Sequence, residues 1–164
     1  MMGTVVQVNI SPGGVPKRPI AEGMITPLGI EGDGHAHPEV HGGPQQAVLL
    51  LCLETIEELK AEGFAVYPGA LGENLTVEGL DRRRIRIGQR YRAGDAILEI
   101  TKIRRPCKTI GVYGEGIQNA IYDAQVKAGD PTSSRWGRSG FLAAVVRGGR
   151  VSEGAPVVLL DETA

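Results

Sequence analysis

Short runs of β-branched and aliphatic residues, separated by Gly- and Pro-rich segments, recur along the whole chain. Runs of this length bounded by turn residues are typical of β-strands. Residues 73–78 alternate polar and apolar, which predicts a half-buried strand. Residues 46–51 form a nearly continuous apolar run, which predicts a strand buried on both faces. Strands are expected at residues 4–10, in a short stretch within 20–30, and at 46–51, 73–78, 85–87, 90–92, 96–103, 141–146 and 157–160.

Helical periodicity is confined to two segments. In residues 54–62, Ile56 and Leu59 share one face, while glutamates and a lysine occupy the other, and Gly63 follows where a helix-ending glycine is expected. A second helix is expected over residues 116–127. Turns are expected at residues 93–94 and 147–150, and a loop over 31–44. The pattern predicts a mainly β fold, a closed or nearly closed β-barrel of short strands with two or three peripheral helices, as one domain over residues 1–164.

Composition agrees with an ordinary globular domain. Hydrophobic residues make up 41% and charged residues 23% of the 164 residues. The aromatic share of 4% and the net charge of −1 argue against a nucleic-acid-binding surface. No signal peptide and no apolar run long enough to span a membrane are evident, so we expect a cytoplasmic protein without a membrane partner.

The charges are unevenly distributed. Residues 1–81 hold 3 Lys/Arg and 11 Asp/Glu, whereas residues 82–108 hold 10 Lys/Arg and only two acids. A compact basic surface attracts phosphates and other anions, and a phosphorylated small molecule fits this balance better than a nucleic acid. The run 82–84 alone is equally consistent with a solvated loop.

The two cysteines lie in different settings. Cys52 belongs to the apolar run 47–53 and is interpreted as core packing. Cys107 follows Pro106 and is flanked in sequence by Lys102, Arg104, Arg105 and Lys108, which favour the thiolate over the thiol. Thiolates attack electrophiles, carry sulfur and bind soft metals. Because proline interrupts a strand, we expect this thiol where a strand gives way to a loop.

Other chemistry-bearing residues give weaker signals. The histidines His35, His37 and His41 lie with acids in one Gly-rich loop, but their spacing matches no structural zinc pattern, and exposed or hydrogen-bonded histidines are the alternative. Gly42 and Gly43 would let backbone amides approach an anion closely, or simply form a turn. Asn74, beside a turn, could bind a ligand or cap the turn. No P-loop, dinucleotide fingerprint or nucleophile elbow is present.

Six segments together resemble the MOSC domain family, named for the C-terminal domain of molybdenum cofactor sulfurases, and most closely its small stand-alone bacterial members. They comprise Asn9-Ile-Ser-Pro-Gly-Gly-Val-Pro-Lys-Arg18, Gly32-Asp33, His41-Gly-Gly-Pro44, Gly72-Glu-Asn-Leu-Thr-Val-Glu-Gly-Leu-Asp81, Gly94-Asp-Ala-Ile-Leu-Glu99 and Arg105-Pro-Cys107. The resemblance implies a β-barrel-like fold and the molybdenum cofactor (molybdopterin), a pterin dithiolene that bears a phosphate.

The resemblance also implies roles for individual residues. Cys107 would carry sulfur as a persulfide or ligate molybdenum. Residues expected to bind the cofactor are Lys17, Arg18, His41, Gly42, Gly43, Asn74, Arg104 and Arg105. A cofactor-binding or sulfur-carrier module is the first expectation, and a small molybdoenzyme that reduces N-hydroxylated substrates with an external reductase is the second. A barrel that binds a phosphorylated ligand, with Cys107 merely reactive, is the third.

Partners follow from these expectations. The 164 residues hold no pyridoxal-phosphate desulfurase domain, so a separate sulfur donor protein would supply the sulfur.

The chain departs from the family pattern at two positions: Gly34, where many members carry a basic residue, and Ala144, where members often carry Arg. Arg135, Arg138 or Arg147 could compensate for the missing cations.

Overall fold

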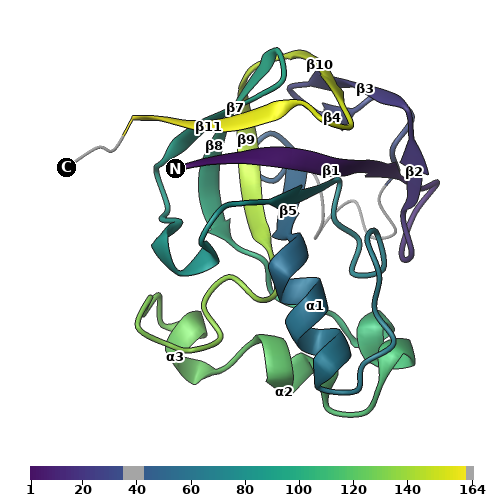
Figure 1. Cartoon of the computed structure of the whole chain (residues 1–164), viewed down its shortest axis with the longest axis vertical. Coiled ribbons are helices and arrows are strands. Elements are labelled where there is room, and N and C mark those ends of the chain that lie inside the picture. Colours follow the sequence, from purple (N-terminus) through teal and green to yellow (C-terminus); the bar gives the residue numbers. More distant parts are fainter. Residues whose placement is uncertain (35–42, 162–164) are drawn as a thin grey trace.

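The computed structural model describes residues 1–34 and 43–161, which form a strand-rich body with helices gathered at one end (Figure 1). The strands are β1 (Met2–Ile10), β2 (Arg18–Ile20), β3 (Glu22–Thr26), β4 (Gly29–Ile30), β5 (Val48–Cys52), β6 (Leu75–Glu78), β7 (Arg90–Ala93), β8 (Ala96–Ile103), β9 (Phe141–Arg147), β10 (Gly149–Ser152) and β11 (Pro156–Asp161). The helices are α1 (Leu53–Ala61), α2 (Ile117–Ile121) and α3 (Ala124–Lys127), with 3₁₀ turns η1 (Arg82–Arg84) and η2 (Lys108–Tyr113).

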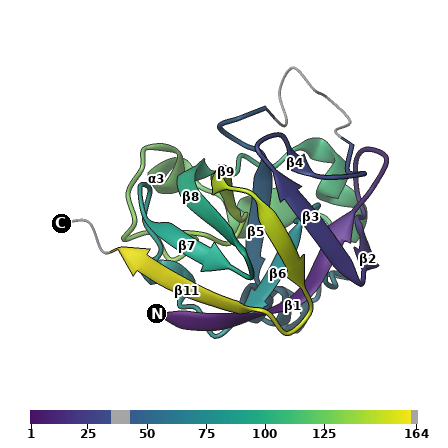
Figure 2. The same cartoon turned by 90° about the horizontal axis from the view of Figure 1, so that it is seen from above.

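Seven strands close into a barrel, as predicted. Their order around the ring is β11-β7-β8-β9-β5-β6-β1, and antiparallel pairing of β1 with β11, Met2 opposite Val158, closes it (Figure 2). The β5–β6 pair is parallel and the other pairs of the ring are antiparallel. Strand β2 extends the sheet beside β1, and β10-β3-β4 form a separate small sheet. Closure removes the exposed strand edges that would otherwise invite aggregation.

Strand patterns explain which side chains fill the barrel. The first six residues of β8 alternate between buried and partly exposed, so one face of the strand lies against the interior. All five residues of β5 are buried, because the barrel lies on one side and the helical layer on the other. Leu50 packs in the barrel core, whereas Leu51 packs in a second cluster with Ile56, Leu59, Ile110 and Tyr113. The second cluster therefore fixes α1 and η2 against the end of the barrel.

Local sequence accounts for the first helix and its end. Ile56 and Leu59 are buried, as their spacing predicts. Gly63 adopts a φ of +99° just after the helix and thus provides the left-handed residue that often ends a helix. Of the helices in the described residues, none has the length and apolar character that crossing a membrane requires.

Four sequence-based predictions of elements are wrong. Residues 85–87 are not a strand, because Asp81 caps the 3₁₀ turn η1 through the Arg83 amide and the chain turns again before β7. The helix expected over 116–127 is split at Asp123, whose carboxylate accepts the Val126 amide at 2.8 Å and begins α3. Residues 149–150 begin strand β10 rather than completing a turn. Strand β6 is buried on both faces at Leu75–Val77, not half-buried.

Candidate functional site

Cys107 lies at the seam between the barrel and the helical layer. It follows β8 by four residues and immediately precedes η2, where Ile110 and Tyr113 anchor the turn in the second apolar cluster. Two hydrogen bonds also hold the end of β8 in place. The Arg104 amide donates to Gly140 O at 3.0 Å, and Ser139 Oγ donates to Arg104 O at 2.6 Å. The thiol thus sits where a strand gives way to a turn, as predicted, and packing on both sides fixes its place.

The surroundings of Cys107 favour its thiolate. A hydrogen bond of 2.7 Å joins Cys107 Sγ to Thr109 Oγ1. Partial burial acts to raise the pKa of the thiol, but the Thr109 hydroxyl, the Arg104 guanidinium and nearby backbone amides outweigh it, so the pKa lies below its ordinary value. The sulfur is half-buried rather than sealed. It can therefore be both ionised and reached.

Arg104 is buried, and its guanidinium charge interacts with both Cys107 and Glu73. Its side chain is 5% exposed, and its Nη1 donates to Ser139 O at 3.3 Å. Burial lowers the pKa of the guanidinium, while the Cys107 sulfur and the Glu73 carboxylate raise it. Gly72 borders Arg104 Nη2: a Cβ there would lie 4.0 Å away, and the glycine φ of +89° disfavours any side chain.

Glu73 is the functional candidate that sequence reasoning did not select. It is fully buried, and its Oε2 accepts from the Gly69 amide at 3.0 Å and the Thr76 hydroxyl at 2.8 Å. Its Oε1 has no hydrogen-bond partner in the described structure. Burial raises the pKa of this carboxyl, and the Gly69 amide, the Thr76 hydroxyl and Arg104 oppose the rise. In the sequence, the one feature that could have drawn attention to Glu73 is its position next to the candidate residue Asn74.

Asn74 and Lys17 belong to a polar network inside the fold. Lys17 Nζ contacts both Asp33 oxygens, at 2.6 and 2.7 Å, and the side chains are 9% and 2% exposed. Asn74 Nδ2 donates to Asp33 Oδ2 at 2.9 Å, and Asn74 Oδ1 accepts the Leu49 amide at 3.0 Å. These contacts join the β1–β2 loop to β5 and to the start of β6. Both predicted cofactor residues thus have partners within the protein.

The remaining predicted cofactor residues are placed differently. Arg18 on β2 and Arg105 after β8 are exposed, as is Gly43, which has a φ of +85°. His41 and Gly42 lie outside the described residues, as do His35 and His37. Within residues 1–34 and 43–161 no group of three or more His, Cys, Asp or Glu side chains is arranged to hold a metal ion.

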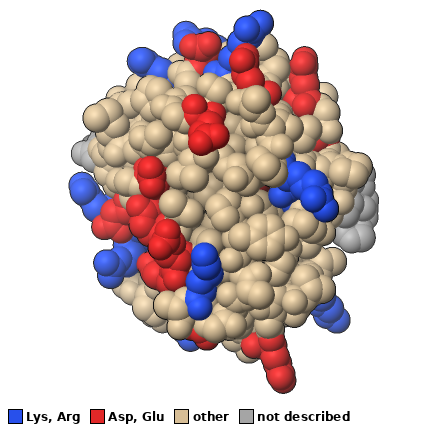
Figure 3. All heavy atoms as spheres, turned by 45° about the vertical axis from the view of Figure 1, so that its right-hand side comes forward, with Lys and Arg blue, Asp and Glu red and all other residues tan. Residues whose placement is uncertain are grey.

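The positive excess of residues 82–108 is not one basic surface. Arg82 pairs with Glu58 at 3.4 Å, Arg83 with Asp81 at 3.8 Å and Arg90 with Glu99 at 2.9 Å. On the face drawn in Figure 3, Lys and Arg side chains lie among Asp and Glu side chains. Glu58 comes from α1 and Glu99 from the strand paired with β7, so folding places both beside these arginines, whereas Asp81 is close to Arg83 in sequence.

The departures from the family pattern also have structural settings. The Gly34 amide donates to Ser11 O at 2.7 Å, and a Cβ at Gly34 would lie 2.2 Å from Pro12 O, so this backbone leaves no room for a basic side chain. Ala144 lies within β9 opposite Glu99. The arginines considered as substitutes are engaged elsewhere: Arg138 with Glu58, Glu62 and Ala120 O, Arg135 with Asp123, and Arg147 with Asp95 O.

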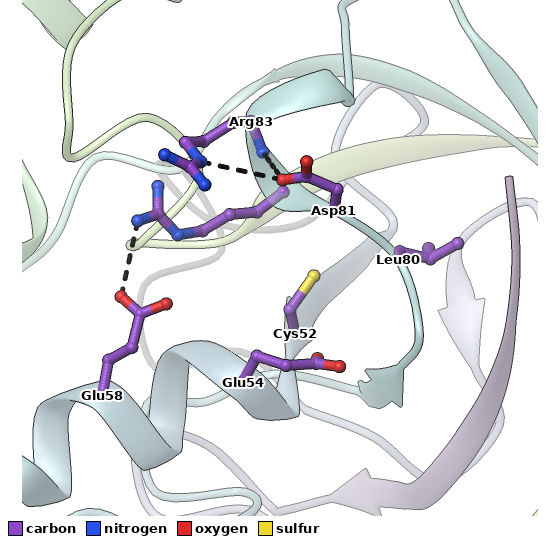
Figure 4. Close-up of a pocket in the computed structure, with 7 residues that line it drawn as sticks. Cys52, Glu54, Glu58, Leu80, Asp81 and Arg83 are labelled. Atoms are coloured by element: carbon purple, nitrogen blue, oxygen red, sulfur yellow. Dashed lines mark hydrogen bonds and ion pairs between the residues drawn. The ribbon is translucent and has the colours of Figure 1, made fainter.

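A cleft of about 400 Å³ lies between α1 and η1, around the other cysteine (Figure 4). The Cys52 sulfur points toward the segment that carries Leu80 and Asp81. Burial raises the pKa of this thiol to about 12, so it is neutral and unreactive near pH 7. Cys52 is 1% exposed and packs in the core, which confirms the prediction for it. The thiol in this cleft therefore disfavours the thiolate, in contrast to Cys107, whose pKa is lowered.

Comparison with known proteins finds relatives of the same fold. Protein YiiM of Escherichia coli (strain K12) is 32% identical over 146 residues, covering 84% of this chain and 59% of that protein. The uncharacterized protein YflK of Bacillus subtilis (strain 168) is 34% identical, covering 90% of this chain and 63% of that protein. The chain thus spans about three fifths of the length of these relatives. A protein named reductase from Gibberella moniliformis is 28% identical, covering 81% of this chain and 23% of its own length.

The fold and a family model agree with these relatives. A crystal structure of a hypothetical protein superposes with a TM-score of 0.75 at 27% identity, covering 100% of this chain and 70% of that one. The family model of the MOSC domain matches residues 37–158, more than half of the sequence. The chain therefore belongs to the MOSC domain family.

Proposed function

We propose that this protein binds the molybdenum cofactor or carries sulfur, with Cys107 as the molybdenum ligand or the persulfide-bearing residue. The MOSC domain family is associated with this cofactor. The observation that carries the proposal is the setting of Cys107: a half-buried sulfur, hydrogen-bonded to Thr109 at 2.7 Å, beside a buried guanidinium that favours the thiolate. Both roles require an ionised and accessible sulfur.

The donor set around Cys107 fits the cofactor. A thiolate is the soft ligand that molybdenum accepts, and when bound the cofactor would supply the oxygen-atom or sulfur chemistry that the protein lacks. Arg104 offers guanidinium donors to oxo or phosphate oxygens, and Glu73 Oε1 is a buried acceptor with no partner among the described residues. Arg105 and Arg18 are exposed and could reach a phosphate at the rim.

In the sulfur-carrier role, Cys107 itself reacts. Its thiolate attacks the terminal sulfur of a donor persulfide, the donor S–S bond breaks, and the donor thiolate leaves. The new Cys107 persulfide passes its terminal sulfur to an acceptor by the same exchange, with no net oxidation. Arg104 and Thr109 stabilise the anionic sulfur before and after transfer.

Metal and sulfur analysis of one preparation tests both roles. The protein is purified from a host that makes the cofactor, and molybdenum is measured by elemental analysis. Metal-free protein is then treated with a persulfide donor, and cyanide-labile sulfur is measured. We expect molybdenum near one equivalent, or labile sulfur near one equivalent, and Cys107→Ser should lose whichever is found.

Cys52→Ala is the matched control, because it removes the other thiol and leaves Cys107 in place. This variant should retain the metal or the sulfur. If wild type takes up neither, or if Cys107→Ser takes up as much as wild type, the proposal is wrong.

A second candidate is a small molybdoenzyme that reduces N-hydroxylated substrates with an external electron donor. It is favoured by the relative whose name is reductase, of which this chain matches 23%. The assay is turnover of an N-hydroxylated compound by molybdenum-loaded protein with a chemical reductant. Turnover that disappears in Cys107→Ser supports this candidate, and full metal loading without turnover excludes it for the compound tested.

A further inference from the structure

Three exposed cations surround Cys107 in sequence and have no partner among the residues that the structure describes. Lys102, Arg105 and Lys108 are all exposed, and in the described part of the chain none of their side chains makes a hydrogen bond or an ion pair. Several other cations of the same basic stretch are satisfied: Arg82 and Arg90 pair with glutamates, and Arg104 is buried. Unpaired positive charge of this stretch therefore remains within five residues of Cys107 in sequence.

The three cations start from successive segments: Lys102 from β8, Arg105 from the link after it and Lys108 from the start of η2. Lys108 follows Lys102 by six positions, so their backbones can lie at most about 20 Å apart. A phosphate group contacts cations within a few ångströms, as the buried Arg104 could do, whereas cations distributed along such a stretch match a protein surface. Val112, in the turn that follows Cys107, is 78% exposed. A partner that covers Lys108 would also bury this apolar side chain, and the burial of apolar area favours association.

We propose that Lys102, Arg105, Lys108 and Val112 form a docking surface for a protein partner with an acidic contact face. The inference rests on the proposed function, in which Cys107 must receive sulfur or serve a site that receives electrons from another protein. Opposite charges raise the rate of encounter by steering the partner toward the sulfur, and salt reduces this effect. The acidic partner would bring its own reacting group to Cys107.

Disulfide exchange with charged peptides measures this steering directly. Two peptides carry one cysteine activated as a pyridyl disulfide, flanked either by glutamates or by glutamines. The Cys107 thiolate attacks the peptide sulfur, the activated S–S bond breaks, and pyridinethione leaves as the recorded chromophore. The rate with the acidic peptide is divided by the rate with the neutral peptide. This ratio reports the electrostatic potential near the thiol, because a variant that changes the intrinsic reactivity of the thiol changes both rates by the same factor.

We expect the acidic peptide to react about tenfold faster at low ionic strength, and the advantage to shrink in 0.5 M NaCl. The triple variant Lys102→Gln/Arg105→Gln/Lys108→Gln should bring the ratio to within about twofold of unity. The control Lys60→Gln/Arg84→Gln/Lys127→Gln removes three cations that are also exposed and unpaired but lie elsewhere, and it should keep the wild-type ratio. Equal effects of the two triple variants would overturn the proposal, as would a wild-type ratio near unity.

A small anionic disulfide separates a docking surface from a small-anion site. The dianion 5,5′-dithiobis(2-nitrobenzoate) is compared with neutral 4,4′-dithiodipyridine in the same proteins. A charge-dependent gain that is smaller for the small dianion than for the peptide supports the docking surface, and an equal gain overturns it. Neither measurement uses molybdenum or persulfide, so failure of the metal and sulfur analysis and failure of the docking surface are distinguishable.

Discussion

Asp33→Asn tests how strongly the buried network supports the β1–β2 loop. The Asp33 carboxylate accepts from Lys17 Nζ at 2.6 and 2.7 Å, from the Ser11 amide at 2.9 Å and from Asn74 Nδ2 at 2.9 Å, and its side chain is 2% exposed. Asparagine keeps the shape but leaves the Lys17 ammonium, itself 9% exposed, without a counterion. Removing one partner of a buried ion pair costs about 3–5 kcal/mol.

That loss is a large part of the total stability expected for such a domain, about 5–15 kcal/mol. At this chain length it corresponds to a fall in Tm of about 10 °C. Trp136 is the single tryptophan and is 2% exposed, so its fluorescence reports unfolding in urea. The free energy of unfolding should fall at an unchanged m-value.

Glu99→Gln is the control, because it breaks the exposed Arg90–Glu99 pair and should cost less than about 1 kcal/mol. The double variant Lys17→Met/Asp33→Asn should lose less than Asp33→Asn alone, since no unpaired buried charge remains. If Asp33→Asn costs no more than Glu99→Gln, the ion pair does not support the loop and the reasoning fails.

The remaining predictions concern thiol reactivity, backbone strain and acid stability. Iodoacetamide at pH 7.5 should label Cys107 in the native protein and Cys52 only in urea, and mass spectrometry that finds native Cys52 labelled would contradict the burial that raises its pKa to about 12. Gly63→Ala, with φ +99° and open space, should cost about 1 kcal/mol of unfolding free energy. Gly69→Ala should cost clearly more, because its Cβ would lie 2.2 Å from a backbone oxygen, and equal urea midpoints would refute this. The pKa of Asp123 is lowered by its bond to a backbone amide, so its stabilisation is present above the unfolded pKa and is lost as pH falls through the folded value. Urea unfolding at pH 6 and pH 3.5 should therefore show a smaller acid loss for Asp123→Asn than for wild type.

Local patterns were sufficient where neighbours in sequence determine the structure. The spacing of Ile56 and Leu59 predicts α1, and the apolar run before it predicts the buried strand β5, because helical and extended periodicity are properties of a few consecutive residues. Local patterns gave a wrong prediction where a capping residue decided where a helix begins. At Asp123 a single carboxylate bonds a backbone amide and divides the expected helix in two.

For the candidate site, the sequence by itself determined the family, through motifs that match the MOSC domain, and indicated the candidate residue, a thiol in a cationic segment after a strand. Only the tertiary structure decided which neighbours act on that thiol. Arg104 is buried beside Cys107 and Arg105 is exposed, because successive side chains of an extended chain point to opposite sides. Glu73, from a distant loop, lies close enough to Arg104 for their charges to interact, and Glu58 of α1 pairs with Arg82 of the basic stretch. Such contacts join residues far apart in sequence, and only folding brings them together.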